Sequence, residues 1–206
     1  MQIIYPFKYD DGATVLLTED EFKNTFPNTF KYLLSKRELL EERKDSRKTF
    51  ADSNKWYSLT RFGQLENFKK EKIVFPGEQK KPKFSIDRNQ SGYSGARVFG
   101  VTITETEINL KFLLAILNSK VITFVIHSTF PVKAGGYFSM SSTFVEKLPI
   151  IQLSASNQKP LIDLTTKILE AKQKGEDTST LELEVDQLVY KLYDLTEEEV
   201  KIIENI

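Results

Sequence analysis

The chain has 206 residues, contains no cysteine, and balances 29 basic against 29 acidic side chains. Without cysteine it can form neither a disulfide nor a Cys-ligated zinc or iron–sulfur site, which favours a reducing compartment, and we expect the cytoplasm. A net charge of zero argues against a strongly basic, self-sufficient nucleic-acid binder. The N-terminal sequence lacks the pattern of a signal peptide, and no apolar run is long enough to span a membrane, so no membrane partner is expected.

The balanced total conceals a partition of charge along the chain. From Lys31 to Gln90 there are sixteen basic and nine acidic residues, whereas Pro160 to Ile206 holds five basic and twelve acidic residues. The first stretch is therefore suited to contact with phosphate groups, and phosphate would repel the second.

Three elements are predicted at the start of the chain. Residues 1–17 indicate a short hairpin or edge segment that turns at Asp10-Asp11-Gly12. Thr18 and Glu21 have the spacing of a capping box, in which each residue satisfies the other's free N–H group, so a short helix begins there. From Asn28 to Lys48, apolar residues among many charges predict a long, mostly solvated helix.

The pattern then changes to short β-like runs. These runs, from Lys55 onward, are KWYSL, KIVFP, KFSID and ARVFGVTIT. Loops that contain Pro, Gly and Ser separate them, which predicts a sheet with long loops.

The stretch LLAILNSK, Leu113 to Lys120, predicts a buried helix because apolar residues cover most of its circumference. A capping box at 104–107 predicts its start, and Asn118-Ser119 its end. The β-branched run VITFVI that follows is typical of a strand covered on both faces. A loop rich in Gly and Ser, PVKAGGYFSMSS, then leads to TFVEKLPI, where Pro149 ends the element.

The last part of the chain predicts helices. After a Ser/Asn/Gln linker, one amphipathic pattern runs from Leu161 to Leu169 and another from Leu181 to Leu192, which indicates a helical hairpin. A third capping box at 196–199 begins a final short helix. The predicted fold class is therefore α+β, with a central mixed β-sheet, packed helices and a C-terminal helical appendage.

The order of these motifs resembles a known family. YPFK, FPNTFKYLLSKRELLEER, KWYSLTR, KIVFPG, LLAILNSK, EKLPI and LVYKLYDLTEEEVKIIE follow the order seen in the TaqI-like C-terminal specificity domain. That domain closes many bacterial restriction–modification proteins, downstream of an N6-adenine methyltransferase domain. The LLAILNSK and LPI pair is also similar to segments of the target-recognition domains of type I specificity subunits, which likewise read DNA sequence.

The resemblance implies a sequence-specific double-stranded DNA recognition domain that positions an upstream methyltransferase domain of the same polypeptide, and a nuclease where the parent protein has one. The chain lacks an Asn/Asp-Pro-Pro-Tyr motif and a Gly-rich cofactor segment. We therefore expect it to be a non-catalytic C-terminal piece, with S-adenosylmethionine and any Mg²⁺ bound elsewhere in the parent. The expected division is an extended and helical segment at 1–50, an α/β target-recognition core at 51–152, and a helical hairpin with a final helix at 160–206.

Two stretches carry the candidate DNA contacts. In the basic stretch from Lys69 to Arg97, Lys and Arg can neutralise phosphates, while Arg and Gln have the fork geometry that reads purine edges. In the Gly-rich stretch, Gly135-Gly136 permits a tip that enters a groove. An ordinary solvated surface and a mobile loop are the respective alternatives. The predicted DNA-binding residues of these stretches are Lys80, Lys81, Lys83, Arg88, Gln90, Tyr93, Arg97, Lys133, Tyr137 and Ser139. Arg61, which follows the aromatic pair Trp56-Tyr57, is a further predicted contact, with an ordinary surface role as its alternative.

Two other functions stay open from the residues alone. The chain could be a docking module of a restriction–modification assembly, with its helices bound to a partner. Alternatively, Glu78-Gln79-Lys80 matches half of a metal-dependent nuclease site, for which Asp52 is the nearest upstream acid. We interpret Trp56 as a core residue and His127, which has no second ligand nearby in the sequence, as structural.

Overall fold

The computed structural model describes residues 3–45, 48–49, 55–59, 62–89, 98–104 and 107–205. Contacts group these residues into two compact units, one up to Lys70 and one from Glu71 onward. The division into three segments at 1–50, 51–152 and 160–206 stays a prediction.

The first unit begins with the predicted hairpin and the predicted capped helix, and both are confirmed. Asp11 and Gly12 turn the hairpin with φ of 46° and 81°. Thr18 accepts a hydrogen bond from the Glu21 N–H, and the Glu21 carboxylate accepts one from the Thr18 N–H. The elements are β1 (Phe7–Asp10), β2 (Ala13–Leu16), α1 (Glu19–Thr25), α2 (Pro27–Leu34), α3 (Arg37–Glu41), β3 (Lys44–Asp45), β4 (Lys48–Thr49) and α4 (Leu65–Phe68).

The prediction of a single long helix from Asn28 to Lys48 is wrong. The structure has α2, then a break, then the short α3, followed by β3 and β4. At the break the Ser35 hydroxyl donates to the Tyr32 carbonyl, a local bond that competes with the helical pattern. After α3, the Arg43 guanidinium donates to the carbonyls of Trp56 and Ser58, which directs the chain away from a helical path.

A small aromatic core holds the first unit together. Its buried members are Leu17, Phe22, Phe30, Trp56 and Tyr57. Residues 55–58 form turns rather than the expected strand, because their consecutive aromatic side chains both point inward, and Trp56 is fully buried. The Trp56 indole N–H donates to Glu19, and the Tyr57 hydroxyl donates to the Leu17 carbonyl. The interpretation of Trp56 as a core residue is confirmed.

The second unit contains two small sheets and the remaining helices. Its sheets have the strand orders β7-β5-β8 and β6-β10-β9. The elements are β5 (Lys72–Pro76), β6 (Glu78–Gln79), β7 (Ser85–Asp87), β8 (Val98–Val101), α5 (Leu110–Asn118), α6 (Lys120–Thr129), β9 (Val132–Lys133), β10 (Tyr137–Ser139), α7 (Ser142–Val145), α8 (Ala155–Lys174), α9 (Ser179–Leu192) and α10 (Glu197–Glu204).

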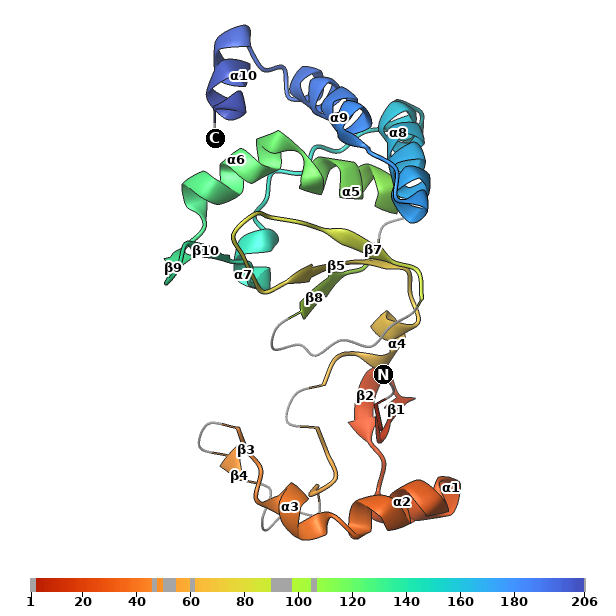
Figure 1. Cartoon of the computed structure of the whole chain (residues 1–206). Coiled ribbons are helices and arrows are strands. Elements are labelled where there is room, and N and C mark those ends of the chain that lie inside the picture. Colours follow the sequence, from red (N-terminus) through yellow and green to blue (C-terminus); the bar gives the residue numbers. More distant parts are fainter. Residues whose placement is uncertain are drawn as a thin grey trace. The chain divides into compact units, whose positions relative to one another are not determined.

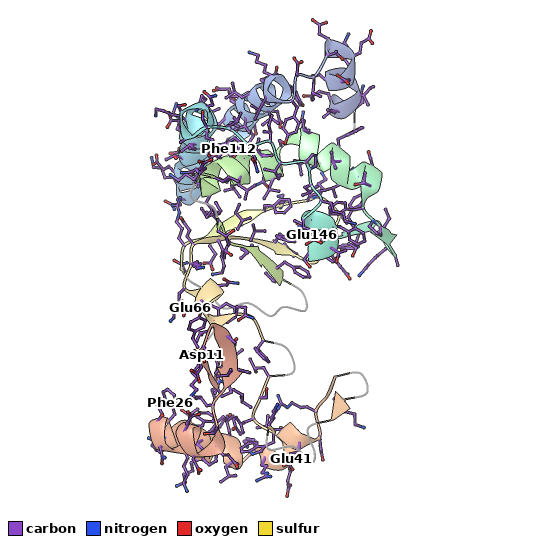
Figure 2. All side chains as sticks on the ribbon, turned by 180° about the vertical axis from the view of Figure 1, so that it is seen from behind. Asp11, Phe26, Glu41, Glu66, Phe112 and Glu146 are labelled. Atoms are coloured by element: carbon purple, nitrogen blue, oxygen red, sulfur yellow. The ribbon has the colours of Figure 1, made fainter. Side chains whose placement is uncertain are left out.

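Helices cover one face of the β7-β5-β8 sheet in two successive layers. Figure 1 shows α5 and α6 crossing this face, with α8, α9 and α10 on the far side of them. Phe112 of α5, labelled in Figure 2, is fully buried among these layers. Leu161 of α8, Val189 of α9 and Ile203 of α10 belong to the same hydrophobic core. The C-terminal helices are therefore an integral part of the second unit.

The α+β class and the C-terminal helices are confirmed, but the strand VITFVI is wrong. Residues 121–126 lie in α6, and the strand pairs of the described residues are all antiparallel. Ser119 is in an extended conformation, and its hydroxyl accepts from the Ile122 N–H, so it starts a new helix directly after α5. An apolar, β-branched run suits either a buried strand or a buried helix, and packing decides between them.

Two helix starts and one loop also differ from the prediction. α5 begins after Asn109, whose side chain accepts from the Lys111 N–H, and not at the spacing motif 104–107. α8 begins at Ala155, inside the expected linker. Residues 132–139, expected as a loop, form the hairpin β9–β10, and α7 follows it. The capping box at Thr196 is confirmed.

Among the described residues, no helix taken singly has the length and apolar character needed to cross a membrane. α5 and α6 meet those criteria only as a pair, and they are bent by 59° at their junction.

Candidate nucleic-acid interface

The β6-β10-β9 sheet joins the two stretches that carry the candidate DNA contacts. β6 comes from the basic stretch, and β9 and β10 come from the Gly-rich stretch. In the antiparallel register Tyr137 lies opposite Lys133, and Ser139 lies opposite Glu78. Opposed residues, and alternate residues along a strand, share one face of a sheet. We call the shared set, Glu78, Lys80, Lys133, Tyr137 and Ser139, the hairpin face.

Tyr137 lies between two lysines on the hairpin face. The Lys80 ammonium nitrogen is 5.2 Å from the centroid of the Tyr137 ring, a cation–π distance. On the other side, Lys133 is its cross-strand neighbour. Tyr137 is 40% exposed, so its ring and hydroxyl remain accessible. The face thus presents an aromatic ring flanked by positive charge, an arrangement that suits contact with a polyanion.

Glu78 partly neutralises the hairpin face. Its carboxylate accepts a 2.6 Å hydrogen bond from Lys133, and both side chains are about half exposed. A carboxylate repels the phosphates of a DNA backbone, but it can accept a hydrogen bond from the amino group of cytosine. Neither Glu78 nor its pairing with Lys133 was among the predicted contacts.

The hairpin that carries the face turns at two glycines. Gly135 and Gly136 have φ of 78° and 76°, a left-handed region that side chains with a Cβ rarely adopt. The Gly136 N–H donates to the Lys133 carbonyl and closes the turn. A Cβ placed on Gly136 would meet no atom within 4 Å, so the tip is open on its outer side.

On the opposite face of the same sheet, Phe138 and Gln79 are buried, whereas Val132 on the outer strand is 63% exposed. Phe138 is buried, and its ring stacks on His127 of α6 with a centroid distance of 4.5 Å. The His127 Nε2 atom is buried without a hydrogen-bond partner. The stacking of Phe138 on His127 fixes which face of the short sheet is turned outward.

The described part of the chain contains no group of three or more His, Cys, Asp or Glu residues that could hold a metal ion.

Residues 80–83, Lys80-Lys81-Pro82-Lys83, form a basic loop that follows β6. Lys80, Lys81 and Lys83 are all exposed. Burial of Glu182 on α9 would raise the pKa of that carboxyl, but hydrogen bonds from Lys172 and Thr178, with a smaller effect from Lys83, lower it. Lys83 therefore interacts electrostatically with Glu182 on α9, whereas the Lys80 ammonium lies over the Tyr137 ring.

Amide side chains anchor both ends of the basic loop. The buried Gln79 accepts a 2.9 Å hydrogen bond from the Lys83 N–H. Asn118, at the end of α5, accepts from the Phe84 N–H and donates to the Phe84 carbonyl, both at 3.0 Å. The sequence pattern marked Asn118 only as a helix stop, and a contact between residues 34 positions apart leaves no local signal.

The remaining predicted contacts are not brought to the hairpin face by any described interaction. Arg88 follows β7, is exposed, and pairs with Glu71 at 3.3 Å. The predictions for Arg61, Gln90, Tyr93 and Arg97 fall outside the described residues, as does Asp52 of the nuclease alternative.

Residues 19–150 match the family of the TaqI-like C-terminal specificity domain, and the chain belongs to that family. This confirms the resemblance drawn from the order of the motifs. The chain is also 23% identical, over 217 residues, to the type II restriction enzyme and methyltransferase RM.Eco57I of Escherichia coli. The similarity covers 94% of this chain and 22% of that protein, so the chain spans about a fifth of its relative's length.

Proposed function

We propose that this chain is a sequence-specific double-stranded DNA recognition domain of a restriction–modification protein. The observation that carries the proposal is the hairpin face, where Lys80, Lys133 and Tyr137 from two distant stretches meet on one exposed surface. Membership of a family of specificity domains supports it further.

The hairpin face has the parts that duplex recognition needs. A two-stranded ribbon fits into the major groove, and the open Gly135-Gly136 tip would lead the β9–β10 hairpin into it. Lys80 and Lys81 would neutralise phosphates beside the groove. Ser139 and Glu78 would contact base edges, with Glu78 released from Lys133 to accept from a cytosine amino group. Each well-made base contact would add about 1–3 kcal/mol of discrimination.

We propose further that the chain is not itself catalytic. In this view it positions a methyltransferase domain of the same polypeptide, which precedes it, and a nuclease where the parent has one. S-adenosylmethionine and any catalytic Mg²⁺ would bind in those other parts. The name of the Escherichia coli relative, which joins both activities in one protein, supports this arrangement.

Charge reversal in the basic loop tests the recognition proposal. The double variant Lys80→Glu and Lys81→Glu should abolish salt-sensitive binding of the chain to its preferred duplex, identified by selection from random duplexes. The matched control reverses Lys167 and Lys201, two exposed lysines of α8 and α10 in the outer helical layer. It changes the net charge equally and should bind like the unchanged chain. Equal losses of duplex affinity in both variants would show that the effect comes from net charge alone, and would contradict the proposal.

A docking module is the second candidate, and the surface of the first unit favours it. Several large apolar side chains there are 47–65% exposed: Ile3, Tyr9, Phe26, Tyr32, Leu39 and Phe62. Exposed apolar side chains mark a surface that another protein covers where they form a contiguous patch. If the basic-loop variant leaves DNA binding of the assembled parent protein unchanged, docking is the better description.

A further inference from the structure

Asn118 ends the apolar sequence of α5 and binds the backbone of Phe84, the residue that directly follows the basic loop. Its amide group forms two hydrogen bonds of 3.0 Å with the backbone of Phe84, one to the N–H and one from the side-chain N–H to the carbonyl. The same amide nitrogen also donates to the Leu114 carbonyl within α5. The side chain is exposed, although the six residues before it are buried.

Phe84 is itself a fixed point for the loop. Its side chain is buried and its ring lies 5.1 Å from that of Phe75 on β5. At the other end, Gln79 is held in β6, accepts from the Lys83 N–H and donates to the Pro76 carbonyl at 3.4 Å. Each end of the basic loop is thus tied by an amide side chain, while the three lysines between them are exposed.

We propose that Asn118 is a positioning residue for base recognition: it holds the basic loop in the conformation that sets the register of the hairpin face on DNA, without touching DNA itself. This inference rests on the proposed function. Ordering a loop when DNA binds costs conformational entropy, and a loop that is already ordered avoids most of that cost. Attraction to phosphate needs only the charges of the loop, whereas bringing Ser139 and Glu78 to the correct base edges needs those phosphate contacts in a fixed geometry. Loss of Asn118 should therefore weaken binding to the preferred duplex more than binding to unrelated DNA.

The adjacent Ser119 provides a control for simple destabilisation. Its hydroxyl donates to the Ile116 carbonyl at 2.7 Å and caps α6 through the Ile122 N–H. Ser119→Ala therefore weakens the same helix junction while leaving both Phe84 bonds in place. Asn118→Ala removes those bonds, and because the side chain is exposed, it leaves no buried cavity.

Backbone hydrogen exchange of the full chain is the first measurement. In Asn118→Ala, the amide of Phe84 should exchange about 5- to 10-fold faster, as expected for loss of one or two hydrogen bonds of ordinary strength. Amides in the interior of β5 should be unchanged. In Ser119→Ala, the amide of Phe84 should exchange at the rate found in the unchanged chain. Retained protection of Phe84 in Asn118→Ala, or equal loss in Ser119→Ala, would overturn the inference.

Duplex binding is the second measurement, and it separates the inference from the proposed function. The ratio of affinity for the preferred duplex to that for an unrelated duplex should fall about tenfold in Asn118→Ala, with the salt dependence of binding unchanged. Ser119→Ala should keep the ratio. A released loop with an unchanged ratio would refute the role in discrimination alone. Absence of any duplex binding by the unchanged chain would instead refute the proposed function, and with it the role of Asn118 in recognition.

Discussion

Lys72 of β5 and Asp87 of β7 form an ion pair inside the second unit, with a nitrogen–oxygen distance of 2.8 Å and side chains that are 0% and 9% exposed. The two residues lie directly opposite each other in the strand register. Asp87 also accepts a hydrogen bond from the Asn89 N–H, where β7 ends. A buried charge depends on its partner, because water can no longer solvate it. The pair therefore makes β5 and β7 sensitive to loss of either member.

The first prediction is that Lys72→Met destabilises the second unit by about 3–5 kcal/mol, because the Asp87 carboxylate is left without its buried cation. The double variant Lys72→Met and Asp87→Leu should lose less free energy of unfolding than the two single variants lose together, since neither charge of the pair remains. Urea unfolding, followed by circular dichroism of the helices, measures all three variants. Additive losses would contradict the coupling.

A second prediction concerns Gln158 of α8, which is fully buried. Its carbonyl oxygen accepts from the Asn109 N–H, and its amide nitrogen donates to the carbonyls of Glu107 and Leu153. Gln158→Leu leaves these three backbone groups without this hydrogen-bond partner and should lower the free energy of unfolding by about 2–4 kcal/mol. Gln173→Leu, the same change at an exposed position of α8, should stay within about 0.5 kcal/mol. Similar losses at both positions in urea unfolding would refute the role of the buried amide.

The third prediction follows from Asp186 of α9. Burial raises the pKa of its carboxyl, and the charges of Glu204 and Glu182 add to the increase, although the Lys120 N–H and the Lys120 charge oppose it. The folded chain then binds this proton more tightly than the unfolded chain, so stability should fall as the pH rises above the ordinary value of 3.8.

Asp186→Asn removes that pH dependence while keeping an oxygen that can accept from Lys120. The variant should therefore be more stable than the unchanged chain near neutral pH, with a smaller difference in acid. Urea midpoints at several pH values test this. A variant that is less stable by the same amount at every pH would show that the carboxylate charge is favourable here.

The fourth prediction concerns Glu21 in α1. Hydrogen bonds from Lys8 and then from Thr18 lower its pKa from 4.5 to about 2. The unfolded chain binds the proton more tightly, so the stabilisation is complete above pH 4.5 and is lost as the pH falls towards about 2. Glu21→Gln should unfold the first unit more easily at neutral pH, and the difference should vanish in acid.

Trp56, the single tryptophan, reports on the first unit by its fluorescence. Asp20→Asn is the matched control for Glu21→Gln, because it removes a charge from the same first turn without breaking a capping bond. If the control shows the same pH dependence, the effect belongs to the helix dipole and not to the hydrogen bonds from Lys8 and Thr18.

Local signals predicted the parts of the fold whose interactions are local. The capping boxes at Thr18 and Thr196 were correct, because each joins residues three positions apart and needs no tertiary partner. The same spacing at 104–107 misplaced the start of α5, because the described capping residue is Asn109. The region around 107–109 is held by Gln158, some 50 residues away.

Long-range pairing explains why only part of the candidate site was predictable. The sequence identified Lys80 and Tyr137 separately, since charge and glycine content are local properties. It could not show that they meet, because that depends on a two-residue pairing of β6 with β10 across about 60 positions. The tertiary contacts of Asn118 and Glu78 were not predicted, for the same reason. Their roles lie in contacts with Phe84 and Lys133, which no spacing rule reveals.

The open tip of the β9–β10 hairpin has a consequence for evolution. Its inner side is locked by Phe138 against His127, whereas the outer side of Gly136 meets no neighbouring atom. Insertions and exchanges at this tip would leave the hydrophobic core untouched. Under the proposed function, a lineage could therefore acquire new target preferences by altering a few residues there, while its scaffold stays under constant selection for stability.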